Sequence, residues 1–144
     1  MMLIIACGAK KLDRTACARD LYVGAYFKAC LAYALALAPA RDIFILSAKY
    51  GLIGINDHIE PYDLKMGEPG SITSIKLSEQ AEFGGLLDEK VIVLGGKQYV
   101  GLCHKVWPKL EAPLEGKGGL GKQIAWMRKR TEEKSHFGTA NDAN

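Results

Sequence analysis

The stretch FILSAKYGLIG, residues 44–54, decides the fold. Together with the residues just before it, it predicts a buried strand over residues 42–46, because the run is short, apolar and without period-two alternation. The run stops at Ser47, and an alanine, a lysine, a tyrosine and a glycine follow. A buried strand does not itself require this ending. The Ser47–Gly51 turn is therefore a candidate for a functional role.

Similar apolar runs occur at residues 2–6 and 91–94 and predict two further strands. Apolar residues at helical spacing predict a helix from Leu21 to Ala38, with Asp20 as its N-cap. Strands that alternate with helices are typical of an α/β domain with right-handed crossovers. We expect one α/β domain over residues 1–135, with a central, mainly parallel sheet and helices on both faces. The other expected segments are helices at 78–87, 98–107 and 122–134, a long irregular connection at 48–71, and a polar, disordered tail at 136–144.

The composition is that of an ordinary globular protein. The chain has 144 residues and a net charge of +3, which gives no strong field for nucleic acid by itself. Its four cysteines are scattered and none forms a CxxC pair, so we expect no metal, and we expect no cofactor either. Cys30 and Cys103 lie in helical patterns and are expected to be buried free thiols. No apolar run is long enough to span a bilayer, which favours a cytoplasmic protein.

The ends of the predicted strands are alike. They read ACGAKK, LSAKYG and LGGKQY, so small residues precede a lysine each time: Lys10, Lys49 and Lys97. In a parallel sheet these ends meet at the carboxyl edge, where such folds bind ligands. Small residues let the backbone approach a ligand, and lysine offers a charge to an oxyanion. The pattern predicts an anionic ligand, although small turn residues and solvated lysines are also common without any ligand. The small residues concerned are Gly8, Ser47, Gly51, Gly95 and Gly96.

Candidate catalytic groups flank these strand ends. Glu60 and Asp63 lie in the long connection and could serve as a general acid or base. Cys7 directly follows the first strand, where Lys10 or Lys11 could activate its thiolate. The alternatives are a solvated loop for the carboxylates and a structural role for the thiol.

The segment GKGGLGK, residues 116–122, carries Lys117 and Lys122. It lacks the GxxxxGK[ST] spacing of a phosphate-binding loop, since Gln123 follows Lys122. A lid, a nucleic-acid contact and a plain flexible loop all fit this composition.

Two segments resemble a known family. IIACGAKKLDRTACARDLYVGAYFKACLAYA, residues 4–34, and IFILSAKYGLIGINDHIEPYDLKMG, residues 43–67, resemble a small uncharacterised prokaryotic and phage domain family with a SAKYG motif (DUF6884-like). Residues 47–67 are more distantly similar to the YaaA-like peroxide-stress proteins, which are longer than this chain. The resemblance implies action on nucleotides or modified bases, or DNA binding. The matching positions are Cys7, Gly8, Lys10, Lys11, Arg19, Asp20, Leu21, Tyr22, Ser47, Lys49, Tyr50, Gly51, Glu60, Pro61, Tyr62 and Asp63.

These observations favour an enzyme that acts on a nucleotide, a nucleoside or a nucleic-acid base, with the N-glycosidic bond as a candidate for the bond it cleaves. In this hypothesis Lys10, Ser47 and Lys49 hold phosphate, and Tyr22 and Tyr50 stack on a base. Glu60 or Asp63 stabilises a cationic sugar or moves a proton. Two alternatives remain: a nucleotide sensor without turnover, and a nucleic-acid-binding module. The residues that would contact nucleic acid in the module are Lys117, Lys122, Arg128, Lys129 and Arg130.

Overall fold

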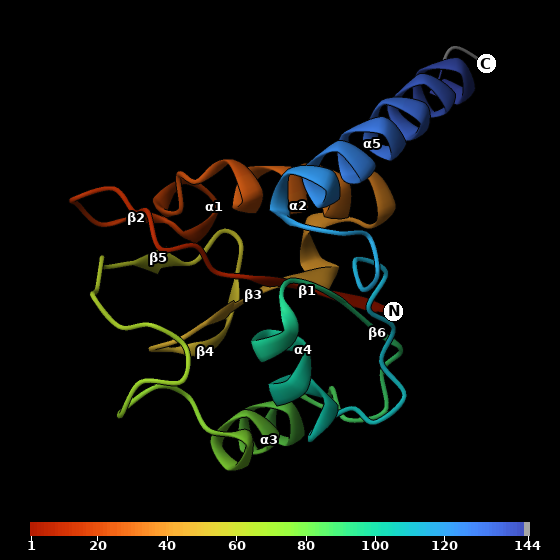
Figure 1. Ribbon diagram of the computed structural model, residues 1–144. Coiled ribbons are helices and arrows are strands. Elements are labelled where there is room, and N and C mark those ends of the chain that lie inside the picture. Colours follow the sequence, from red (N-terminus) through yellow and green to blue (C-terminus); the bar gives the residue numbers. More distant parts are fainter. Residues whose placement is uncertain (143–144) are drawn as a thin grey trace.

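The structure is a computed structural model that describes the backbone of residues 1–142 and side chains up to residue 134. It is an α/β domain in which a four-stranded sheet lies between helices (Figure 1). The strands are β1 (Met2–Ala6), β2 (Ala16–Cys17), β3 (Ile43–Ser47), β4 (Gly51–Gly54), β5 (His58–Ile59) and β6 (Val91–Leu94). The helices are α1 (Ala18–Leu21), α2 (Ala25–Leu37), the 3-10 turn η1 (Ala40–Asp42), α3 (Ser74–Phe83), α4 (Lys97–His104) and α5 (Leu120–Asp142).

The main sheet has the order β4-β3-β1-β6. The central strand β1 pairs in parallel with both β3 and β6, whereas β4 pairs antiparallel with β3. The predicted strands are therefore parallel neighbours, and the predicted sheet, mainly parallel, is confirmed. Their carboxyl ends lie at one edge. The outer side of β6 is covered by the segment around Glu111, whose backbone bonds to Val91 and Val93.

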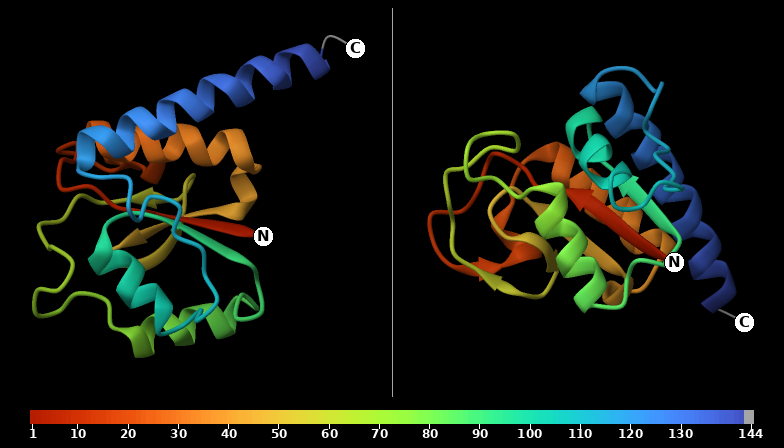
Figure 2. Two further views of the ribbon diagram at one scale, coloured as in Figure 1. Left: turned by 45° about the vertical axis from the view of Figure 1, so that its right-hand side comes forward. Right: turned by 90° about the horizontal axis from the view of Figure 1, so that it is seen from below.

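Both faces of the sheet are buried, which explains the apolar strands. Leu3 and Ile5 of β1 face the cluster formed with α2 and α5, whereas Met2 and Ile4 face the cluster formed with α3 and α4. The figures show the same two layers, with α2 and α5 on one side of the sheet and α3 and α4 on the other (Figures 1 and 2). The expected helices on both faces are confirmed.

The first long helix begins later than predicted. Leu21 closes the short helix α1, and α2 begins only after Gly24, so Asp20 does not cap it. The reason is a tertiary pairing. Tyr22 forms a β-bridge with Lys11, and Val23 donates its backbone N–H to Lys10 at 3.0 Å. This pairing keeps the backbone extended between the two helices.

The other helices are shifted from the prediction by a few residues. The N-cap of α3 is Thr73, whose hydroxyl accepts from the Lys76 N–H at 3.2 Å, so this helix starts and ends earlier than expected. The helix α5 starts before Lys122 and continues to Asp142, through most of the segment that the sequence predicts as a tail. Residues 143–144 lie outside the described part of the chain.

The long connection after β3 is more ordered than predicted. It forms the edge strand β4 and then β5, which pairs antiparallel with β2 in a small second sheet. Residues 60–73 then lead to α3 without further strands or helices. This last part lies beside the carboxyl edge of the main sheet (Figure 1).

Candidate functional site at the carboxyl edge of the sheet

The turn after β3 is held by its own serine. Ser47 is fully buried, and its Oγ accepts hydrogen bonds from the backbone N–H groups of Lys49 at 3.2 Å and Tyr50 at 3.1 Å. A hydroxyl that bonds the backbone two and three residues ahead is a common way to stabilise a turn. The backbone N–H groups of Lys49 and Tyr50 are thus already satisfied within the protein and are not free to meet an anionic ligand.

Gly51 completes this turn. Its φ of 74° lies in the left-handed region, which glycine adopts without strain. The side chain of Gln80 on α3 accepts from Leu52 N–H and donates to the Tyr50 carbonyl, both at 2.9 Å. A Cβ on Gly51 would lie only 2.2 Å from the Gln80 Oε1. The glycine therefore leaves room for Gln80 and does not face a ligand.

A cluster of three hydroxyls links this turn to two other segments. The Tyr62 hydroxyl lies 2.7 Å from the Ser47 Oγ and 2.6 Å from the Tyr22 hydroxyl. Burial raises the pKa of Tyr22 to about 12, and it also raises the pKa of Tyr62. Both phenols therefore stay protonated at neutral pH. We call Tyr22, Ser47 and Tyr62 the hydroxyl cluster.

Two lysines rest on aromatic rings next to the hydroxyl cluster. The Lys11 Nζ lies 4.3 Å from the Tyr62 ring centroid, and the Lys49 Nζ lies 5.2 Å from that of Tyr50. The Tyr50 and Tyr62 rings meet edge to face at 5.6 Å. These contacts place the segments that follow β1 and β3 side by side, as expected for one common edge.

The order of strands creates a switch point between β1 and β6. The chain leaves β1 toward α2 on one face of the sheet, and it leaves β6 toward α4 on the other face. Connections that leave two adjacent parallel strands toward opposite faces open a crevice at their carboxyl ends, and this crevice is the usual ligand site of such sheets.

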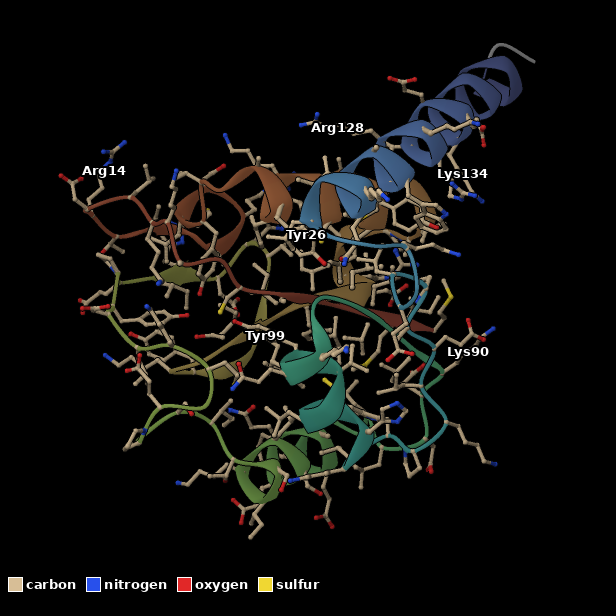
Figure 3. The ribbon with its side chains drawn as sticks, in the orientation of Figure 1. Arg14, Tyr26, Lys90, Tyr99, Arg128 and Lys134 are labelled. Carbon is tan, nitrogen blue, oxygen red and sulfur yellow. The ribbon has the colours of Figure 1, made fainter. Side chains whose placement is uncertain are left out.

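Cys7 and Tyr99 meet in this crevice. Tyr99 lies on α4 (Figure 3). Its hydroxyl donates to the Cys7 carbonyl at 3.3 Å and lies 3.4 Å from the Cys7 Sγ. Burial raises the pKa of Tyr99, so this phenol also stays protonated. The strand ends approach closely here, since a Cβ on Gly95 would lie 2.7 Å from the Ala6 Cβ.

A pocket of about 280 Å³ opens at this crevice. We call it the switch-point pocket. It takes residues from the end of β1, from the connection before α3, and from α4. The lining residues are Cys7, Gly8, Ala9, Lys11, Asp63, Leu64, Lys65, Met66, Gln98 and Tyr99.

The pocket gathers some of the predicted site residues. Cys7, Gly8, Lys11 and Asp63 all line it, although Asp63 is far from the others in the sequence. Sequence reasoning missed Lys65, Gln98 and Tyr99. A signal for the last two was present, because a helix that follows the LGGK strand end must begin at the same edge of the sheet.

The remaining predicted residues lie outside this pocket. Tyr22, Ser47 and Gly51 are buried behind it, so Tyr22 offers no surface on which a base could stack. Gly95, Gly96 and Lys97 line a separate hollow of about 410 Å³ beside the Gly116–Gly118 loop. Arg19 is half-buried, and its backbone N–H donates a hydrogen bond to the Ile55 carbonyl. Those on the exposed surface are Lys10, Lys49, Glu60, Lys117 and Lys122.

Two basic residues near the C-terminus rest on the same tryptophan ring. The Arg130 guanidinium lies 3.8 Å from the Trp126 ring centroid, and the Lys117 Nζ lies 5.3 Å from it. Arg128 leaves α5 on a different side from Lys134 (Figure 3). A cation that lies on the face of a tryptophan ring already interacts favourably with the protein, so it is less available to a phosphate.

The four cysteines of the chain are free thiols. Cys30 and Cys103 are fully buried, as predicted, and burial raises the pKa of each thiol to about 12. Within the part of the chain that the structure describes, no three His, Cys, Asp or Glu side chains come together in a way that could hold a metal ion. None of the helices described there is long and apolar enough to cross a membrane.

Comparison with known proteins gives a family but no activity. No curated protein and no solved structure matches the chain. A family model matches residues 2–129, which include the whole sheet and the switch-point pocket. The chain therefore belongs to a family of unknown function (DUF6884).

Proposed function

We propose that the chain is an enzyme that acts on a nucleotide, a nucleoside or a nucleic-acid base bound in the switch-point pocket. One observation carries the proposal. Cys7, Lys11 and Asp63, which the sequence singles out as candidate site residues, line one pocket at the switch point of the sheet. A concave site with a few convergent polar groups is the usual form of a small-molecule site.

The size and lining of the pocket favour a ring-shaped ligand. Its volume of about 280 Å³ lies just below the usual range for ligand pockets, which suits a base or a nucleoside better than a dinucleotide. Tyr99 offers an aromatic ring, and Gln98 offers an amide that can both donate and accept hydrogen bonds. Such groups are suited to the edge and the face of a base.

Asp63 is the carboxylate of the site in this proposal, because it lines the pocket whereas Glu60 does not. In hydrolysis of an N-glycosidic bond, the bond from the sugar carbon to the base nitrogen breaks and its electron pair leaves with the base. A water oxygen then bonds to the sugar carbon, and a proton from this water ends on the base. A carboxylate stabilises the positive charge on the sugar or accepts the proton of the water.

The test compares two carboxylates of the same connection. Parent protein is screened by thermal shift against nucleotides, nucleosides and short oligonucleotides, since a ligand that binds the folded state raises its stability. Each hit is incubated with the protein and product release is followed by chromatography. We expect Asp63→Asn to lower turnover by about 10²–10⁴-fold, with affinity within a few-fold of the parent. The matched control Glu60→Gln should keep full turnover.

Other outcomes would replace the proposal. Full activity of Asp63→Asn on a verified substrate would remove the carboxylate from the mechanism. Tight binding of a nucleotide without turnover would favour the nucleotide sensor. Binding of oligonucleotides alone, unaffected by Asp63→Asn, would favour the nucleic-acid-binding module.

A further inference from the structure

The side chain of Lys11 is attached to a stretch of backbone that hydrogen bonds hold in place. Lys11 forms a β-bridge with Tyr22, and the residues on either side are tied to the same segment: Leu12 donates to the Leu21 carbonyl at 2.9 Å, and Val23 donates to the Lys10 carbonyl at 3.0 Å. A side chain on such a base is positioned with less loss of entropy than one on a mobile loop. The aliphatic part of the Lys11 side chain therefore enters the switch-point pocket from a fixed backbone position.

Lys11 is half-buried as a residue, and its ammonium has no carboxylate partner among the residues that the structure describes. Its Nζ lies 4.3 Å from the Tyr62 ring centroid and 5.8 Å from that of Tyr22. Its hydrogen-bond partner is the Ala9 carbonyl at a long 3.4 Å. Within the described residues, no Asp or Glu oxygen lies within 4.0 Å of it. Asp63 lines the same pocket but is not paired with it. An ammonium carries three donors, so at least two of them are free to meet a ligand.

The hydroxyl cluster fixes the ring beneath this charge. The Ser47 oxygen accepts from two backbone N–H groups, so its own O–H proton is left to donate to Tyr62. With a second bond to Tyr22, the Tyr62 side chain cannot swing away from its position without breaking hydrogen bonds. The edge-to-face contact with Tyr50 sets the tilt of the Tyr62 ring. The aromatic face under Lys11 is thus preorganised. The Tyr62 ring holds the Lys11 ammonium in place without neutralising its positive charge.

We infer that Lys11 is the anion-binding residue of the switch-point pocket, and that the ligand carries a phosphate group. This inference rests on the proposed function and narrows its substrate class to a nucleotide, or to a phosphate of a nucleic-acid chain, rather than a free base or nucleoside. Asp63 and the aromatic lining then face the part of the ligand away from the phosphate. The sequence assigned phosphate to Lys10 and Lys49, but neither lines this pocket.

The experiment uses probes that differ by one phosphate. Isothermal titration at low salt compares nucleoside monophosphates with the matching nucleosides, and ribose 5-phosphate tests the phosphate without a base. We expect the monophosphates to bind more tightly than the nucleosides. Lys11→Met should remove about tenfold or more of the monophosphate affinity, the scale of a charged hydrogen bond, and should leave nucleoside affinity unchanged.

A neighbouring lysine provides a matched control. Lys10→Met removes an adjacent exposed ammonium that does not line the pocket. It should stay within about two-fold of the parent on the same probes, since the Lys10 ammonium is not held on the two tyrosine rings. Oligonucleotides with and without a terminal phosphate distinguish a free nucleotide from a phosphate within a chain.

Several results would overturn the inference. These are equal affinity for nucleoside and monophosphate, no binding of any phosphate probe, or an equal loss in Lys10→Met and Lys11→Met. If phosphate binding depends on Lys11 but no probe is turned over, the role of Lys11 is supported and the proposed enzymatic function is contradicted. If a nucleoside is turned over and Lys11→Met leaves that turnover intact, the enzymatic function is supported and the role of Lys11 is contradicted.

Discussion

Ser47 shows how one buried side chain sets the geometry of the carboxyl edge. Its oxygen accepts from Lys49 and Tyr50 and bonds to the Tyr62 hydroxyl, so one atom joins the β3 turn to the connection before α3. A small residue with three hydrogen-bonding directions suits this place. The SAKYG motif is therefore explained here by the turn it builds, and the ligand-facing residues lie beside it.

The first prediction concerns this serine. Ser47→Ala removes the acceptor of two backbone N–H groups in the interior, so we expect a loss of about 1–3 kcal/mol in the free energy of unfolding, measured by urea denaturation. Ser71→Ala is the control, because the Ser71 hydroxyl accepts a comparable bond from Gly67 on the exposed surface. It should cost less than about 0.5 kcal/mol. Equal losses would contradict the role of Ser47.

Because of the buried phenols, the free energy of unfolding varies with pH in the alkaline range. The pKa of Tyr22 is about 12 in the folded chain against 10.0 ordinarily, because burial disfavours the phenolate. Between these values the unfolded state has lost a proton that the folded state keeps, so stability falls as pH rises from 10 to 12. Tyr22→Phe should make that fall shallower without abolishing it, since the pKa values of Tyr26, Tyr62 and Tyr99 are raised as well. Unfolding curves at several pH values would check this, and an identical slope in Tyr22→Phe would contradict it.

At the scale of elements, the close approach of β1 and β6 depends on a glycine. Gly95→Ala would place a Cβ 2.7 Å from the Ala6 Cβ, and overpacking of this kind costs about 1–3 kcal/mol in the free energy of unfolding. Gly101→Ala is the matched control, because Gly101 lies in α4 with open space around it. That change should stabilise by about 0.5–1 kcal/mol. A fully stable Gly95→Ala would show that the strand ends can separate at little cost.

The elements also show what sequence could and could not predict. The strands β1 and β6 were predicted to the residue, because short apolar runs covered on both faces leave a clear pattern. The edge strand β4, which pairs with β3, was missed, since two of its four residues are glycines and glycine is depleted in strands. The delayed start of α2 was missed for a similar reason, the tertiary bridge from Lys11 to Tyr22. Thr73 and the glycines after Phe83 did mark the bounds of α3 and were overlooked.

The residues of the candidate site were likewise only partly predictable from the sequence. Cys7, Lys11 and Asp63 were singled out because strand ends and the long connection after β3 were expected at the carboxyl edge, and the structure places all three around one pocket. Lys10 cannot be separated from Lys11 by sequence, since the two are adjacent and chemically identical. The structure separates them, because Lys11 lines the pocket and rests on the Tyr62 ring whereas Lys10 does not line it.

At the scale of the whole molecule, α5 is the element that the nucleic-acid-binding module depends on. It packs on α2 and extends beyond the body of the domain (Figure 2). Its basic residues Arg128, Lys129 and Arg130 are followed by Glu132 and Glu133, and Arg130 rests on Trp126. In such a module the cations of this helix would contact phosphates, so their contribution can be measured directly.

The last prediction follows from this arrangement. We expect the double change Arg128→Gln and Lys129→Gln to alter the affinity for a short single-stranded oligonucleotide by less than about two-fold, and to leave the salt dependence of binding unchanged, because neither residue is near the switch-point pocket. The measurement is a titration at several salt concentrations by fluorescence anisotropy, with Lys11→Met compared in parallel. Each lost phosphate contact would lower the slope of log affinity against log salt by about one. A slope reduced by about two in the double variant, with Lys11→Met unchanged, would make α5 the binding surface and the module the better reading of the chain.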